Sequence, residues 1–179
     1  VFDIFENVDN QMSEWKAGSP LSAVNASAGK QPVQVPVALF ETIEVALQVA
    51  RQTDGAFDPT WAAMWNLWNF TDPKMPEAEE VTSKLPLVDW EAVILNKASS
   101  TVFLPREGMA IGLGGIAKGV AMDQARDALL KHGVVDFLIV AGGQVLANGT
   151  NNGSPWQVGI RTPDEDADEF VFVIQAKNT

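Results

Sequence analysis

The residues with the clearest chemical potential lie in a glycine-rich stretch that runs from Met109 to Asp123. Its turn contains Gly112, Gly114 and Gly115, and Lys118 follows after two further residues. We expect a short strand before this turn and a helix after it, with Lys118 in the first helical turn. Backbone N–H groups in such a turn and at a helix start lack an intrahelical acceptor and bind phosphates or other anions. The stretch therefore predicts an anion site, to which Lys118 adds a positive charge.

A structural turn is the competing explanation for these glycines. Glycine allows tight packing and left-handed backbone conformations, so on the glycines alone the two explanations weigh about equally. A solvated lysine near a helix start is also common. Lys118 nevertheless favours a binding role, because a cation at a helix N-terminus opposes the helix dipole and is stabilised by a nearby anion.

Known nucleotide-binding motifs fit the stretch poorly. Residues 112–117 match the pattern G-x-G-x-x-[GA] of dinucleotide-binding folds. That fold places an acid at the end of the next strand, whereas here the acid, Asp136, stands at the start of the expected strand. The phosphate-loop pattern also fails, because Lys118 precedes Gly119 and no G-K-[ST] occurs. The sequence therefore disfavours a nicotinamide dinucleotide or a phosphate-loop nucleotide.

The first half of the chain must supply most of the helices. Apolar residues recur there every three or four positions, which is the period of an amphipathic helix. Ser19-Pro20 and Asp58-Pro59 each look like a helix cap followed by proline at the first helical position. We expect helices over residues 2–15, 20–25 and 36–50, a loop over 27–35, and a further helix from residue 59.

Three tryptophans, Trp61, Trp65 and Trp68, fall on one face of that last helix. An aromatic stripe at this spacing is more often part of a core or a groove wall than a cofactor site. We therefore expect these side chains to pack in the core.

The second half of the chain has the turn signals and apolar runs of a sheet. We expect a surface excursion over residues 71–89, a hairpin of strands 93–95 and 101–104, a helix ending near 133, a buried strand at 136–141, and strands at 145–147, 156–161 and 170–176. The chain is thus predicted to be a single α+β domain over residues 1–179. Its helical N-terminal half would pack on a mainly antiparallel sheet.

Composition excludes several classes of site. The chain carries 23 acidic against 12 basic residues, a formal net charge of −11, so we expect no nucleic-acid partner. It has no cysteine and a single histidine, His132, which excludes thiolate and multi-histidine metal sites. We expect His132 to be structural, near the end of a helix.

Four blocks in order along the chain resemble the FAD:protein FMN transferase family, usually called the ApbE family. Each block alone is weak, but the four together make a specific match over essentially the whole chain. They are residues 12–25, residues 53–60 with 65–68, residues 112–123, and Gly142-Gly143 followed by residues 156–160.

The resemblance implies an enzyme that uses FAD and Mg²⁺. Such proteins cleave the FAD pyrophosphate, transfer FMN to a Thr or Ser hydroxyl of a target flavoprotein, and release AMP. The family pattern places the backbone carbonyl of Gly115 on the metal, in keeping with the preference of Mg²⁺ for oxygen ligands. It assigns no catalytic residue here. The residues implied to bind FAD are Trp15, Ala56, Phe57, Asp58, Gly112 and Lys118.

Three departures from the family pattern stand out. The family most often has Asp where this chain has Gly112, so we expect a side-chain contact to FAD to be lost or replaced by backbone. Gln144 stands where the family usually has Asp. The sequence stops at Thr179, before the C-terminal blocks with a histidine-containing segment and the side-chain metal ligands. We therefore expect a domain truncated at its C-terminus, with the C-terminal part of the family fold missing, and inactive by itself.

Two other functions remain open. Water in place of the acceptor hydroxyl would make the protein an Mg²⁺-dependent FAD pyrophosphatase that yields FMN and AMP. The chain would otherwise be a non-catalytic FAD-binding module. The resemblance also implies a periplasmic or other extracytoplasmic location, as a possible lipoprotein, with membrane association only through an N-terminal anchor missing from this sequence.

Overall fold

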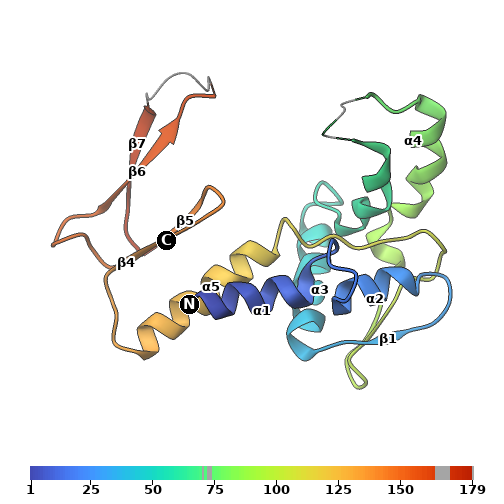
Figure 1. Cartoon of the computed structure of the whole chain (residues 1–179), viewed down its shortest axis with the longest axis horizontal. Coiled ribbons are helices and arrows are strands. Elements are labelled where there is room, and N and C mark those ends of the chain that lie inside the picture. The colour runs from blue at the N-terminus through green and yellow to red at the C-terminus, as the bar shows by residue number, and fades with distance from the viewer. Residues whose placement is uncertain (70, 72–73, 164–169, 179) are drawn as a thin grey trace. The chain divides into compact units, whose positions relative to one another are not determined.

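The computed structural model describes residues 1–69, 71, 74–163 and 170–178 (Figure 1). The chain divides into two compact units. We call Glu6–Ala117 the helical unit, and Val1–Phe5 together with Lys118–Thr179 the hairpin unit. Within the described residues, every helix is too short or too polar to cross a membrane.

The helical unit is built on three amphipathic helices: α1 (Phe2–Met12), which begins in the hairpin unit, α2 (Pro20–Ala26) and α3 (Val37–Gln52). The Ser19 side chain accepts the Ser22 N–H at 2.9 Å, and Pro20 is the first residue of α2, which confirms the predicted cap. After α3 the chain turns at Gly55, whose φ is +77°.

The core of the helical unit joins α2, α3 and the glycine-rich stretch. Leu21, Leu39 and Ile43 have no exposed surface. Alternate residues of the glycine-rich stretch are buried with them, since Met109, Ile111 and Leu113 are at most 1% exposed. Burial of side chains of this size stabilises the fold by about 1.5–3 kcal/mol each. The glycine turn is therefore anchored by the core on its N-terminal side.

A small antiparallel sheet completes this unit, in the order β1-β3-β2. The hairpin of β2 (Ile94–Asn96) and β3 (Thr101–Phe103) confirms the predicted one. We expected a loop over 27–35, but β1 (Val33–Gln34) pairs with β3 in that segment. A strand of two residues has no periodicity to reveal it.

Short helices follow. Asp58 caps a helix beginning at Pro59, as predicted, but η1 (Pro59–Leu67) is a 3₁₀ helix, because the cap and proline suit either helix type. The excursion predicted over 71–89 contains α4 (Ala78–Lys84) and η2 (Leu85–Leu87), and η3 (Trp90–Ala92) follows directly after it. A capping box between Glu77 and Glu80 starts α4 and was missed because its cap is not Ser or Thr. None of these three elements has a buried residue, which confirms their surface location.

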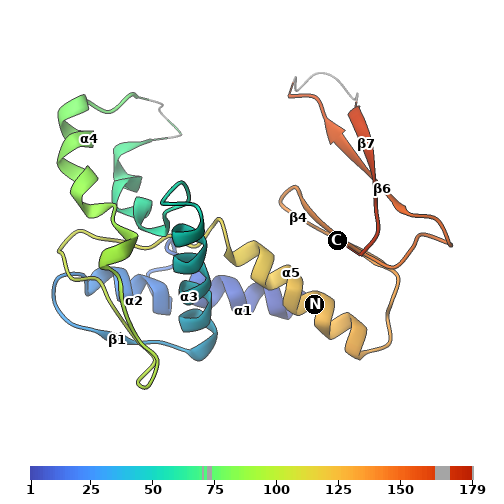
Figure 2. The same ribbon diagram turned by 180° about the vertical axis from the view of Figure 1, so that it is seen from behind.

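The hairpin unit contains α5 (Ala117–Lys131) and two antiparallel hairpins. In the first, β4 (Phe137–Ala141) and β5 (Gln144–Asn148) are joined by Gly142-Gly143, with φ of +55° and +84°. Positive φ at both positions is the requirement of a type I′ turn. In the second, β6 (Trp156–Arg161) and β7 (Phe170–Ala176) lie side by side in both views (Figure 1, Figure 2). The strands predicted at 136–141, 145–147, 156–161 and 170–176 are all present.

Burial in the hairpin unit differs from expectation. The strand at 136–141 was predicted to be buried, but only Phe137 is, and Val140 is 63% exposed. An apolar run shows that a strand can be covered and does not show what covers it. The mixture of helices and antiparallel strands agrees with the predicted α+β class.

Candidate functional site

Three tryptophans form an aromatic cluster on the helical unit. The ring of Trp65 lies 4.8 Å from that of Trp15 and 4.5 Å from that of Trp61, tilted by 56° and 57°. Of the stripe predicted to pack in the core, Trp61 is 40% exposed and Trp65 and Trp68 are only half-buried, so that prediction is wrong. Trp15 is 69% exposed. Trp15, which lies outside η1, and Trp61 thus pack against Trp65 and still expose apolar surface to solvent. Exposed aromatic rings can stack a planar heterocycle.

Asp58 sits at the start of η1 with one carboxylate oxygen engaged. Its Oδ1 accepts hydrogen bonds from the Thr60 backbone N–H at 2.7 Å and the Thr60 hydroxyl at 2.6 Å. Within the described residues Oδ2 has no hydrogen bond, so it can accept one from a ligand. The two preceding residues differ in exposure: Ala56 is exposed, and Phe57 is half-buried.

A chain of polar contacts extends behind Asp58. The Thr60 hydroxyl accepts the Asp89 N–H at 2.7 Å, and Arg106 bonds Asp89 Oδ2 at 2.7 Å. The Arg106 hydrogen bond is the main cause that lowers the pKa of Asp89, against a smaller opposing effect of burial. Thr60 has no exposed surface, so Asp58 is oriented from the protein interior. Sequence reasoning missed these three residues: a capping preference points to Thr60, but no local signal links Asp89 to Arg106.

The glycine-rich stretch runs past Asp58 without forming the predicted strand. Residues 109–113 have no ladder partner among the described residues. Instead the Asn25 side chain bonds both backbone groups of Ile111, donating to its carbonyl at 3.0 Å and accepting its N–H at 2.8 Å. Gly112 donates its N–H to the carbonyl of Pro59 at 2.9 Å. One side-chain amide thus replaces a strand, because it offers the same donor and acceptor pair.

None of the turn glycines Gly112, Gly114 and Gly115 has a left-handed backbone, so a positive φ does not explain them, but close packing explains two of the three. A Cβ on Gly115 would stand 3.0 Å from Cε2 of Phe57. A Cβ on Gly112 would stand 3.1 Å from that of Ala62. Gly114 is exposed and has open space around it. The turn is therefore packed at two positions and accessible at the third.

These contacts bring six of the seven predicted site residues into one neighbourhood. Gly115 meets Phe57, Gly112 meets Pro59 directly after Asp58, and Gly112 also approaches Glu14 directly before Trp15. The three sequence blocks that supply them are far apart in the chain.

Lys118, the seventh predicted residue, belongs to the hairpin unit. It is the second residue of α5, as predicted, and it is exposed. Its Cδ lies 3.8 Å from the Cβ position of Gly142 in the β4–β5 turn. The described residues offer its ammonium group no ion pair, so it is available to an anion.

The described residues contain no cluster of side chains that would by itself hold a metal ion. No group of three His, Asp or Glu among them could hold a metal ion. Gly115, whose carbonyl the resemblance assigns to the metal, is exposed. One backbone carbonyl is too few ligands, because Mg²⁺ is held in proteins by one or two carboxylates together with substrate phosphates and water.

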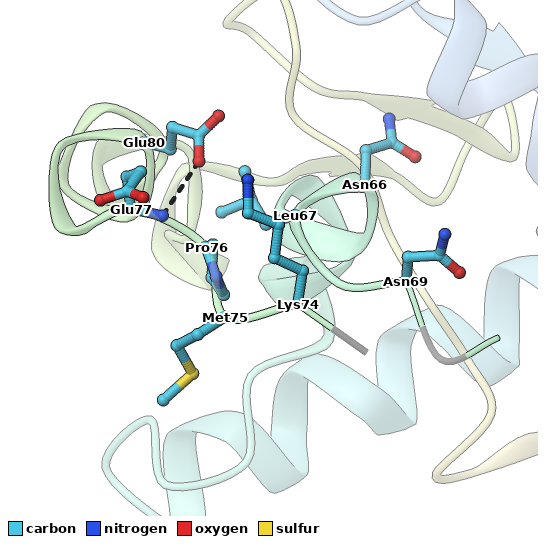
Figure 3. Close-up of a pocket in the computed structure, with 8 residues that line it drawn as sticks. All are labelled: Asn66, Leu67, Asn69, Lys74, Met75, Pro76, Glu77 and Glu80. Carbon is cyan, nitrogen blue, oxygen red and sulfur yellow. Dashed lines mark hydrogen bonds between the residues drawn. The ribbon is translucent and has the colours of Figure 1, made fainter. Parts of the chain in front are cut away.

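A hollow of about 280 Å³ lies elsewhere on the helical unit, between the end of η1 and the start of α4 (Figure 3). Glu80 accepts the Glu77 N–H at 3.0 Å on its rim (Figure 3). None of the predicted site residues lines it, so it is separate from the neighbourhood described above. Its lining consists of Asn66, Leu67, Asn69, Lys74, Met75, Pro76, Glu77 and Glu80.

Comparison with known proteins gives one consistent result. A Klebsiella pneumoniae protein named FAD:protein FMN transferase is 31% identical over 173 residues, which are 96% of this chain and 53% of that protein. The crystal structure of the ApbE protein from Thermotoga maritima superposes with a TM-score of 0.90 at 28% identity, covering 99% of this chain and 58% of that one. The Vibrio cholerae flavin transferase ApbE gives 0.86 at 26% identity, covering 99% and 58%.

The chain spans about half the length of the curated relatives it matches. The model of the ApbE family matches residues 1–179 of this chain. By sequence and by fold, therefore, this chain belongs to the ApbE family.

Proposed function

We propose that the protein to which this chain belongs transfers FMN from FAD to a Thr or Ser hydroxyl of a target flavoprotein and releases AMP. Family membership over the whole chain supports this, together with relatives named FAD:protein FMN transferase. The observation that carries the proposal is the neighbourhood of exposed tryptophans, the free Asp58 oxygen and the open glycine turn in one unit.

Each part of that neighbourhood suits one part of FAD. The flat faces of Trp15 and Trp61 would stack the isoalloxazine or adenine ring. The open backbone at Gly114 would donate its N–H group to a phosphate oxygen, whereas the N–H groups of Ile116 and Ala117 already bond the Leu113 carbonyl. Asp58 Oδ2 would accept a hydrogen bond from a hydroxyl or N–H of the dinucleotide. The role of Lys118, which belongs to the hairpin unit, rests on the family resemblance alone: its positive charge would offset negative charge on the pyrophosphate.

The reaction requires one bond exchange at phosphorus. The acceptor hydroxyl oxygen would attack the phosphorus on the FMN side, and the bond from this phosphorus to the bridging oxygen would break. AMP would leave with that oxygen, and the hydroxyl proton would pass to a base. Catalysis of such a transfer is largely positioning and charge stabilisation. The chain's residues are therefore assigned to binding and orientation.

Dependence on Mg²⁺ is part of the proposal and rests on the family resemblance. The resemblance assigns only the Gly115 carbonyl to the metal, and the described residues contain no group of three acidic or histidine side chains that could hold one, so no step is assigned to the metal here. The same observation favours a second candidate function for this chain, a module that binds FAD without chemistry.

The test is incubation of the full-length protein with FAD, Mg²⁺ and a target peptide containing an acceptor Thr. We expect the peptide to gain the mass of one FMN unit, one AMP to appear per labelled peptide, and EDTA to abolish both. Free FMN without a labelled peptide would identify a pyrophosphatase. Tight FAD binding without AMP release would identify a binding module.

We also propose an extracytoplasmic location, on the family resemblance alone. Fractionation of cells that produce the full-length protein tests it. Recovery in the cytoplasmic fraction would contradict this part of the proposal and leave the chemistry untouched.

A further inference from the structure

Glu14 is an acidic residue that no part of the proposed function uses, yet its carboxylate lies against the glycine turn. Its Oε1 is 3.3 Å from the Cβ position of Gly112, and its Cδ is 3.9 Å from it. We propose that Glu14 binds FAD by accepting a hydrogen bond from an uncharged hydroxyl or N–H group of the dinucleotide. This inference rests on the proposed function, because it places a further ligand contact in the same neighbourhood.

The backbone around Glu14 is held in place. The Ser22 hydroxyl donates to the Glu14 carbonyl at 3.2 Å, and the Ser19 hydroxyl donates to the Ser13 carbonyl at 2.6 Å. Both hydroxyls belong to the capped start of α2, whose Leu21 is fully buried. Glu14 is thus attached to the core of the helical unit, next to the exposed ring of Trp15.

Gly112 makes room for the carboxylate. Its backbone is fixed by the hydrogen bond to Pro59, and the Cβ of Ala62 also approaches it. A side chain at position 112 would be in tight contact with both Ala62 and Glu14, at 3.1 and 3.3 Å. The absence of a side chain therefore lets an acid from another segment reach the turn.

The carboxylate of Glu14 lacks a protein partner. It is half-buried, and no hydrogen bond or ion pair to it occurs in the part of the chain that the structure describes. Three other acids of the helical unit are paired: Asp9 with Lys16, Glu44 with Lys97, and Asp89 with Arg106. A half-buried carboxylate gains from a donor, because it can only accept hydrogen bonds.

The sign of the charge selects the ligand group. A carboxylate repels phosphate oxygens, so Glu14 would contact the part of FAD that carries hydroxyl or N–H donors. Removal of a charge that merely faced the pyrophosphate would tighten binding, whereas removal of a hydrogen-bond acceptor would weaken it. The direction of the change therefore distinguishes the two roles.

The test is titration of FAD into the full-length protein by flavin fluorescence, in the presence of EDTA. We expect Glu14→Ala to weaken FAD binding about tenfold or more, as for loss of a hydrogen bond to a charged group. Glu14→Gln keeps an acceptor and nearly the same shape, so it should weaken binding less. Glu6→Ala is the matched control, because it removes an exposed acid from α1, and it should bind FAD as the parent does.

Separate titrations with FMN and ADP show which half of FAD carries the donor, since only one half should lose affinity in Glu14→Ala. Unchanged or tighter FAD binding by both Glu14 variants would overturn the inference. A loss seen only with Mg²⁺ would also overturn it, in favour of a metal ligand. Failure of the parent protein to bind FAD would instead refute the proposed function. Thermal unfolding identifies a misfolded Glu14→Ala, and Glu14→Gln then decides.

Discussion

The helical unit and the hairpin unit carry similar apolar segments, but the helical unit buries them far more completely. Met109, Ile111 and Leu113 are at most 1% exposed. In β7, five consecutive apolar residues from Phe170 to Ile174 are each 47–57% exposed. A continuous apolar run is typical of a strand covered on both faces. The comparison shows that an apolar run indicates only that a strand can be buried. Whether it is buried depends on the element that packs against it.

The largest expected difference concerns the same substitution in each unit. Ile111→Ala should lower the free energy of unfolding by about 2–5 kcal/mol, because it opens a cavity in the core. Ile174→Ala should cost less than about 1 kcal/mol, because its side chain is already 47% exposed. Urea unfolding of both variants measures this. Equal losses would mean that β7 is covered in solution.

Asn25→Ala removes the amide that takes the place of a strand beside Ile111. Two backbone groups of Ile111 lose their partner, at a cost of about 1–3 kcal/mol for each group that stays buried. The matched change in the hairpin unit is Asn148→Ala, which removes one exposed bond to the Val135 carbonyl and should cost less. Chemical denaturation measures both losses. A larger loss of stability for Asn148→Ala would contradict the expectation that the Asn25 bonds of the helical unit contribute more to stability.

Alanine substitutions at Gly115 and Gly119 should have different effects: the first should weaken FAD binding, and the second should stabilise a helix. Gly115→Ala places a methyl group 3.0 Å from the Phe57 ring, so it should displace that ring and weaken FAD binding. Gly119→Ala in α5 meets nothing within 4 Å and should stabilise the helix by about 0.5–1 kcal/mol. Thermal unfolding and FAD titration of each variant give the two readouts. Unaltered FAD binding by Gly115→Ala would show that the contact between Phe57 and Gly115 does not contribute to FAD binding.

The smallest expected effect is the pH dependence of the Asp89–Arg106 pair. The pKa of Asp89 is lowered from 3.8, so its contribution to stability is present above about pH 4 and is lost as the pH falls through the lowered value. Arg106→Gln should therefore cost roughly 0.2–1 kcal/mol at neutral pH, the range for exposed ion pairs, and less in acid.

Urea unfolding of the parent and Arg106→Gln between pH 7 and pH 3 measures that convergence. Arg126→Gln removes the same guanidinium from α5 and controls for the change in net charge. A difference between parent and Arg106→Gln that grows toward pH 3 would contradict the assignment.

Much of the local structure could be predicted. The caps at Ser19 and Asp58 and the turn at Gly142-Gly143 are present where expected. Caps and turns depend on a few neighbouring residues, so their signals are local. The seven candidate binding residues could be named because short blocks resemble a family, and their roles in binding FAD and Mg²⁺ stay predictions.

Local sequence signals could not predict the contacts that assemble the candidate site. Asn25 and Ile111 are 86 positions apart, and Glu14 and Gly112 are separated further still. The predictions of a strand before the turn and of a core position for Trp61 were wrong because both depend on contacts with segments far away in the sequence.

Residue type and spacing alone determined the main helices, their caps at Ser19 and Asp58 and most of the strands of this protein, and they named the blocks predicted to carry its chemistry. Only the tertiary structure decided which of those blocks meet, because contact between distant segments depends on how the whole core packs. It is this packing that sets the carboxylate of Glu14 against a turn whose glycine leaves room for it.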